Sequence, residues 1–165
     1  MCALTAAQLH IAPQDVIVAS TGVIGQPLDL TPIRSGLPQL AAALGDHSDQ
    51  AAEGIMTTDT QPKEIAVQFT AGGKTCTIGG IAKGSGMIHP NLATMLVFLT
   101  TDCAISAPML HAALTGDVRD TFNMVSVDGD TSTNDMVAVL ANGLAGNAEI
   151  TAPGADFTAF CSALN

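Results

Sequence analysis

KEIAVQFTAGGKTCTI, residues 63–78, contains the most regular pattern of the sequence. Ile65, Val67 and Phe69 alternate with more polar or smaller side chains, which is typical of a strand with one buried face. Gly72 and Gly73 then provide a turn before a second extended run. The sequence therefore predicts a β-hairpin here.

Helix and strand signals are mixed on both sides of this hairpin. Irregular glycine-rich residues 79–90 separate it from a strand opened by Thr94. Short apolar runs predict buried strands at residues 16–20, 94–100, 125–127 and 136–140. Helices are expected at residues 5–11, at 31–44 with a break at Gly36 and Pro38, from Ser48, at 106–114, and at the C-terminus around Phe157, Phe160 and Leu164.

The composition fits a globular chain of the size of one domain, with 165 residues and 47% hydrophobic content. A formal net charge of -10 would repel phosphate backbones and anionic membranes, so we expect no nucleic-acid or membrane partner. No apolar run reaches the roughly 18 residues of a membrane helix, and the N-terminus lacks the basic start of a signal peptide. The expected location is the cytoplasm.

The chain has four cysteines and four histidines, but they are scattered. Neither a C-x-x-C nor an H-E-x-x-H spacing occurs among them. We therefore expect no bound metal.

KGSGMIHPNLATML, residues 83–96, places a glycine loop before a hydroxyl residue at the start of a strand. Such a hydroxyl, that of Thr94, can attack the carbonyl of Ala93 and move the acyl group from nitrogen to oxygen. Water then opens the ester and frees the α-amine of Thr94, which can serve as a base for the hydroxyl. The segment thus fits a self-cleaving nucleophile, although a structural glycine loop with a surface Lys83 explains the same residues.

Three further loops allow two interpretations each. STGVIG, residues 20–25, can present backbone N–H groups to an oxyanion, or can be an ordinary turn after a strand. MTTDT, residues 56–60, and DGDTSTND, residues 128–135, can contact a polar substrate. Both can equally cap neighbouring elements through side-chain hydrogen bonds to the backbone, which we favour.

Taken in order and spacing, residues 20–25, 56–60, 80–88, 93–96 and 128–135 resemble the ornithine acetyltransferase (glutamate N-acetyltransferase) family. The likeness extends from Leu4 to Leu164. It implies a layered α/β sandwich of mixed sheets flanked by helices, as a single partial catalytic domain over residues 1–165. Self-cleavage would divide it into an α-chain portion, 1–93, and a β-chain portion, 94–165.

The resemblance also implies a function. The family moves an acetyl group from N-acetylornithine to glutamate in arginine biosynthesis, without a bound cofactor, and bifunctional members also use acetyl-CoA. By this likeness Thr94 is the nucleophile, Thr21 and Gly22 stabilise the oxyanion, and Thr60, Lys83 and Thr94 contact substrate. Cleavage would fall between Ala93 and Thr94, and the α and β chains would form an oligomer.

Family members are much longer than this chain. A substrate-binding glutamate in a D-G-E-G segment, and asparagine and threonine contacts near the family's C-terminus, have no counterpart in the sequence. The chain therefore resembles the middle of the enzyme, and missing segments of the same enzyme are expected partners. A self-processing hydrolase of similar fold, such as an aminopeptidase, and a truncated, inactive fragment are the alternatives.

Overall fold

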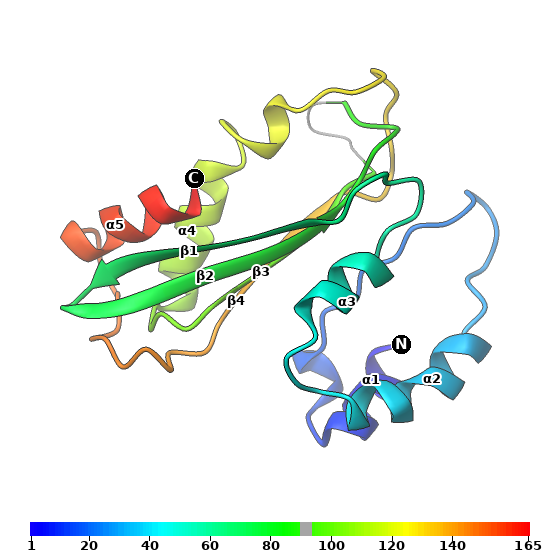
Figure 1. Ribbon diagram of the computed structural model, residues 1–165, viewed down its shortest axis with the longest axis horizontal. Coiled ribbons are helices and arrows are strands. Elements are labelled where there is room, and N and C mark those ends of the chain that lie inside the picture. Colours follow the sequence, from blue (N-terminus) through cyan, green and yellow to red (C-terminus); the bar gives the residue numbers. More distant parts are fainter. Residues whose placement is uncertain (90–93) are drawn as a thin grey trace. The chain divides into compact units, whose positions relative to one another are not determined.

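The computed structural model describes residues 1–89 and 94–165, which form two compact units, Met1–Ser48 and Asp49–Asn165 (Figure 1). The first unit is helical, and the second holds the sheet. The mixed α/β class expected from the sequence is confirmed by this four-stranded mixed sheet with its helices. The division into portions 1–93 and 94–165 stays a prediction.

The first unit consists of two helices and a short 3-10 turn. Helix α1 spans Cys2–Leu9, the 3-10 turn η1 spans Pro13–Asp15, and helix α2 spans Thr31–Ala42. Helix α1 contacts both of the other elements. The carboxylate of Asp29 accepts a hydrogen bond from the N–H of Thr31 at 2.9 Å, so it satisfies a donor that the first turn of α2 leaves free.

Two sequence predictions for this unit are wrong. Helix α2 continues through Gly36 and Pro38; an interior proline removes one intrahelical hydrogen bond and crowds the preceding turn, which can bend a helix without ending it. Residues 16–20 are extended but form no strand, and Ile17 is 59% exposed. A strand needs a neighbour to pair its backbone groups, and the strand pairs within the described residues all belong to the second unit.

The second unit is built on a sheet of order β1-β2-β3-β4. Strands β1 (Lys63–Ala71) and β2 (Lys74–Lys83) form the predicted hairpin, with Gly72 and Gly73 at positive φ in the turn. Strand β3 (Leu96–Thr101) lies antiparallel to β2, and β4 (Met136–Ala141) lies parallel to β3. Helix α3 (Ser48–Gly54) begins at Ser48, as predicted.

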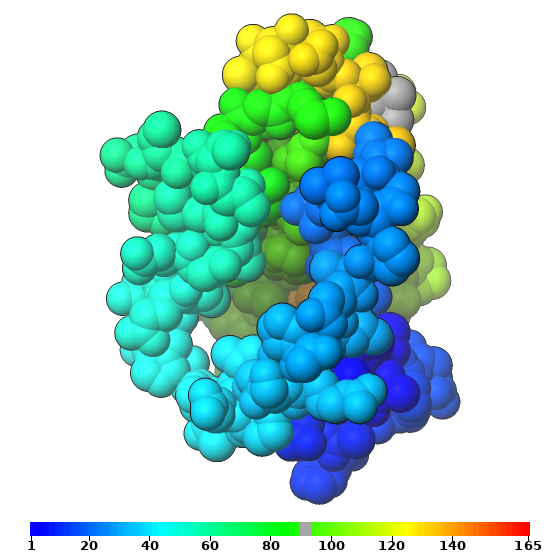
Figure 2. Space-filling model, turned by 90° about the vertical axis from the view of Figure 1, so that its right-hand side faces the viewer, coloured from blue at the N-terminus to red at the C-terminus, as the bar shows by residue number. Residues whose placement is uncertain are grey.

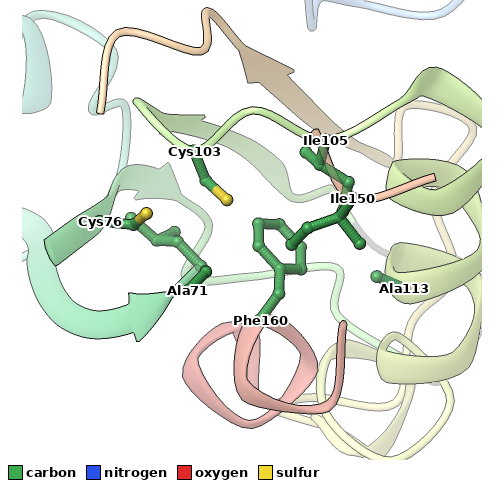
Figure 3. Packing of buried hydrophobic residues seen from close by; sticks show 8 residues of the cluster. Ala71, Cys76, Cys103, Ile105, Ala113, Ile150 and Phe160 are labelled. Atoms are coloured by element: carbon green, nitrogen blue, oxygen red, sulfur yellow. The ribbon is translucent and has the colours of Figure 1, made fainter. Parts of the chain in front are cut away.

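Two helices cover one face of this sheet (Figure 1). Helix α4 (Ala107–Asp117) connects β3 to β4, and α5 (Ala155–Leu164) packs against α4 and β1. Both confirm helices predicted from the sequence. Phe160 of α5 is fully buried and meets Phe69 edge to face, with ring centroids 5.7 Å apart. Figure 3 shows Phe160 at the centre of the core, between residues of both hairpin strands and of α4.

The strand predicted at residues 125–127 is absent from the described structure. The 3-10 turn η2 (Phe122–Met124) precedes these residues, and the N–H of Val127 donates to the carbonyl of Ile88 at 3.0 Å without forming a ladder among the described residues. The irregular loop predicted from residue 79 begins later, because β2 continues to Lys83. Gly80 explains this difference: a Cβ there would lie 2.4 Å from the Leu99 side chain, so the glycine lets β3 pack closely.

Asn147 joins the sheet core to the segment before α5. Its buried amide accepts from the N–H of Ala104 at 2.8 Å and donates to the carbonyls of Ala104, at 3.0 Å, and Ala148, at 2.9 Å. We expect Asn147→Ala to lower the free energy of unfolding by about 1 to 2 kcal/mol, because it removes the acceptor of the half-buried Ala104 N–H and two further hydrogen bonds of a buried side chain. Asn142→Ala, at an exposed site, is the matched control in urea denaturation. Equal losses for both variants would contradict this account.

Candidate functional site

The glycine loop after β2 is held from one side by Asp59. The side chain of Asp59 is fully buried, and one oxygen accepts from the ammonium of Lys63 at 2.5 Å and from the N–H of Gly84 at 2.8 Å. The other oxygen accepts from the N–H of Thr57 at 3.2 Å. Asp59 therefore ties the segment at residues 57–63 to the first residue of the loop.

The same contacts keep Asp59 ionised. Burial alone would raise the pKa of its carboxyl, but the hydrogen bonds from Lys63 and from two backbone N–H groups outweigh it and lower the pKa from 3.8 to about 2. A depressed folded pKa stabilises the fold above the unfolded value of about 3.9. This stabilisation is lost as the pH falls through about 2.

We therefore expect a pH-dependent difference in unfolding free energy between the wild type and Asp59→Asn. It should contain a component on the order of 1 to 2 kcal/mol above pH ~4 that fades toward pH ~2. Denaturant titrations at several pH values measure it, with Glu64→Gln, an exposed neighbouring acid, as control. A difference that stays constant over this range would show that the Asp59 charge has no such role.

A second carboxylate holds the other end of the loop. Asp128 accepts from the N–H of Met87 at 2.7 Å and from the N–H of Ile88 at 3.1 Å. These backbone bonds, the one from Met87 foremost, lower the pKa of Asp128. In Figure 2 the yellow segment that contains residues 120–130 lies next to the green segment that contains the glycine loop, in line with these bonds. Met87 has φ 54°, which a non-glycine residue rarely adopts without such support.

Thr94 lies against this loop, two residues before β3. Its N–H donates to the carbonyl of Met87 at 2.8 Å, and a Cβ on Gly84 would lie 3.2 Å from its carbonyl oxygen. Its Oγ1 is buried, and among the described residues it has no hydrogen-bond partner. An unpaired buried hydroxyl is unfavourable in a folded protein, which makes Thr94 a candidate for a chemical role.

Lys83, the last residue of β2, is only 4% exposed. It pairs in register with Leu96, so its strand position lies close to the start of β3. Within residues 1–89 and 94–165 the ion pairs comprise only that of Lys63 with Asp59, so Lys83 has no carboxylate partner there. A lysine without a carboxylate partner is suited to an anionic ligand.

The predicted site residues fall into three groups. Thr94 and Lys83 lie together beside the glycine loop, and Thr60 is exposed next to Asp59, whose carboxylate reaches that loop. Thr21 and Gly22 belong to the other unit, so their relation to Thr94 stays a prediction. Ala93, on the other side of the predicted cleavage point, lies outside the described residues.

The described part of the second unit has at least two cavities. One, of about 310 Å³, lies beside the hairpin and includes Gly80 and Phe122. The other, of about 540 Å³, lies between α4 and α5 and includes Cys161. Thr94 lines neither of them.

Sequence reasoning did not single out Asp59 and Asp128. Both stand in the two hydroxyl-rich segments for which capping was favoured, and both do cap backbone N–H groups. In the part of the chain that the structure describes, no three acidic, histidine or cysteine side chains gather as a metal site would require. The helices described there are also too short or too polar to cross a bilayer.

These residues define a candidate nucleophile site. Thr94 has an unpaired buried hydroxyl, and it lies near the buried residue Lys83 and a glycine loop held by two carboxylates. Comparison with known sequences places it in a family: the model of the ArgJ family matches residues 1–165. The chain belongs to the ArgJ family, which confirms the family resemblance inferred from the five motifs.

Among the similar curated proteins are several that carry the name arginine biosynthesis bifunctional protein ArgJ. That of Symbiobacterium thermophilum is 55% identical over 165 residues, which cover 99% of this chain and 41% of the relative. That of Geobacillus stearothermophilus is 52% identical over 162 residues, 98% of this chain and 40% of the relative. That of Listeria monocytogenes is 51% identical over 160 residues, which cover 97% of this chain and 40% of the relative. The chain thus spans about 40% of the length of these relatives.

Proposed function

We propose that this chain forms part of a cytoplasmic acetyltransferase of arginine biosynthesis, in which Thr94 is first the agent of self-cleavage and then the acyl carrier. The observation that carries the proposal is the buried, unpaired Oγ1 of Thr94 at the glycine loop, two residues before Leu96, which is the strand partner of the buried residue Lys83. The printed names of the relatives, which refer to arginine biosynthesis, support the same assignment.

The first step would produce the nucleophile. The hydroxyl of Thr94 attacks the carbonyl carbon of Ala93, the peptide C–N bond breaks, and the nitrogen of Thr94 takes up a proton to become an amine. Water then hydrolyses the ester, which leaves a carboxylate on Ala93 and restores the hydroxyl. The new amine lies on the same residue as the hydroxyl and can act as its base.

The second step would transfer acetyl in two halves. The hydroxyl of Thr94 attacks the acetyl carbonyl of N-acetylornithine, ornithine leaves as the amine, and the acetyl remains as an ester on Thr94. The amine of glutamate then attacks this ester and leaves as N-acetylglutamate. Backbone or side-chain donors of Thr21 and Gly22 would stabilise the oxyanion in both halves.

Lys83 has a clear place in this scheme. Both N-acetylornithine and glutamate carry an α-carboxylate, and the ammonium of Lys83, which has no ion pair among the described residues, offers a charge-assisted hydrogen bond to it. We assign Thr60 to the same substrate, as a hydroxyl donor near the loop. Acetyl-CoA, as a second acetyl donor, needs no resident cofactor in this scheme.

Cleavage would not separate the two portions. Six residue pairs between β2 and β3, from Ile78 with Thr101 to Lys83 with Leu96, join the chain on either side of the cleavage point. The α and β portions would therefore stay in one sheet, and we propose that such pairs assemble further into an oligomer together with the remaining segments of the enzyme.

The test uses the whole gene product that contains this chain. It is incubated with N-acetylornithine labelled in the acetyl group, with and without glutamate. We expect the label to pass to glutamate and little free acetate to form. Release of labelled acetate at the same rate without glutamate would instead assign a hydrolase, and the absence of any label transfer would assign an inactive protein.

A further inference from the structure

Asp59 and Asp128 approach the glycine loop from two different segments of the chain. Asp59 holds the N–H of Gly84 at 2.8 Å, and Asp128 holds the N–H groups of Met87, at 2.7 Å, and Ile88, at 3.1 Å. We call these two carboxylates and their three backbone contacts the carboxylate clamp. Between its two ends, the hydroxyls of Ser85 and Thr58 are 2.6 Å apart and add a third tie to the segment at residues 57–63.

The clamped loop contacts Thr94 at both of its ends. At one end Gly84 is so close to the carbonyl of Thr94 that an added Cβ would lie 3.2 Å from it. At the other end the carbonyl of Met87 accepts the N–H of Thr94 at 2.8 Å. The backbone nitrogen and carbonyl of Thr94 are therefore placed by a loop whose own position is set by Asp59 and Asp128.

The backbone of Met87 makes the dependence on Asp128 direct. Its φ of 54° is unfavourable for a side chain with a Cβ, by about 1 to 2 kcal/mol. The N–H of Met87 donates to the Asp128 carboxylate, and the carbonyl of Met87 accepts from the N–H of Thr94. Hydrogen bonds therefore connect the Asp128 carboxylate to the nitrogen of Thr94 through the backbone of Met87. Without the hydrogen bond to Asp128, the unfavourable positive φ of Met87 loses part of its stabilisation.

We propose that Asp59 and Asp128 are positioning residues that set the geometry of Thr94 for cleavage and acyl transfer. The inference rests on the proposed function, because the nitrogen that Met87 holds is the one that cleavage converts to an amine. The carbonyl of Met87 accepts a hydrogen bond from this nitrogen before and after cleavage, and so keeps it beside the Thr94 hydroxyl. Neither carboxylate takes or gives a proton in this role.

The main test compares Asp128→Asn with Asp130→Asn in the whole gene product. Asparagine keeps one acceptor but presents an NH2 group to the second N–H. The control removes the same charge from an exposed neighbour in the same loop. We expect Asp128→Asn to slow self-cleavage on the order of 10- to 100-fold, because small misplacements of a reacting group have effects of this size. Asp130→Asn should cleave at the wild-type rate.

Transfer kinetics on the processed fraction separate positioning from a merely structural role. We expect kcat of Asp128→Asn to fall by a similar factor, with KM for N-acetylornithine within about twofold, since the substrate's own contacts are retained. Cleavage at the wild-type rate in the folded fraction of Asp128→Asn, or a change confined to KM, would overturn the proposal. Asp59→Asn should likewise slow self-cleavage and lower kcat, and its control, Glu64→Gln, should change neither.

Asp128→Glu serves if Asp128→Asn does not fold. It keeps the charge and both oxygens on a longer side chain, so we expect a slowing of about 3- to 10-fold in cleavage; a wild-type rate would contradict the clamp. Thr94→Ala distinguishes a failure of the carboxylate clamp from a failure of the proposed function. If it abolishes cleavage while the clamp variants cleave normally, only the clamp is wrong; if the wild type itself never cleaves at Thr94, the proposed function and the clamp fail together.

Discussion

Thr94→Ala is expected to abolish both self-cleavage and acetyl transfer without lowering the free energy of unfolding. The hydroxyl is the reacting group in both steps, so no other side chain can replace it. The same hydroxyl is buried without a partner among the described residues, a situation that is unfavourable by about 1 to 3 kcal/mol. Removing it should therefore leave the protein as stable as the wild type or more stable.

Two variants control this experiment. Thr94→Ser keeps a hydroxyl at the same position and should still cleave, at a reduced rate. Thr100→Ala removes an exposed hydroxyl from β3 and should change neither cleavage nor transfer. Mass spectrometry follows cleavage, and urea denaturation follows stability. A Thr94→Ala protein that still separates between Ala93 and Thr94 would refute the mechanism.

Lys83→Met is expected to raise KM for N-acetylornithine by about 30-fold or more, which corresponds to about 2 kcal/mol for a lost buried charge contact. Methionine is similar in length and apolar, so it fits a position that is 4% exposed. Because Lys83 has no ion pair within the described residues, the variant should unfold at the same or a higher urea concentration.

Lys74→Met removes the same charge from the exposed end of the hairpin and is the matched control. It should leave KM unchanged, since Lys74 lies at the start of β2 and Lys83 at its end. Steady-state kinetics with both substrates measure the effect. A Lys83→Met enzyme with a normal KM for both would remove Lys83 from the substrate site.

Thr94 and Lys83 differ from Asp59 in their contacts: the buried Thr94 hydroxyl has no hydrogen-bond partner among the described residues, and Lys83, a residue only 4% exposed, has no ion pair there. Asp59, also buried, shows the opposite arrangement, because Lys63 and two backbone N–H groups satisfy it. Under the proposed function, this contrast distinguishes groups that would serve a ligand or a reaction from groups that stabilise the fold.

Much of the second unit could be predicted from local sequence. The alternation at residues 63–71 and the glycine pair at 72–73 define the hairpin, because side-chain period and turn geometry are local properties. The apolar run after Thr94 likewise predicts β3, and Phe157 and Phe160 predict the buried side of α5.

Other features depend on distant contacts and could not be predicted. The strand expected at residues 16–20 requires a pairing partner, which its own sequence cannot specify. Gly80 resembles a loop residue until the Leu99 side chain, on the next strand, occupies the space of its missing Cβ. Asp128 lies 40 residues from the Ile88 N–H that it accepts, so its contact with the glycine loop has no local signal.

Mass spectrometry of the Thr94 peptide after incubation of the whole gene product with N-acetylornithine tests the central claim most directly. The account predicts a peptide that begins at Thr94 and carries one acetyl group on the hydroxyl, which disappears when glutamate is added. A chain that remains joined through Ala93 and Thr94, or an acetyl group found only on another side chain, would contradict it.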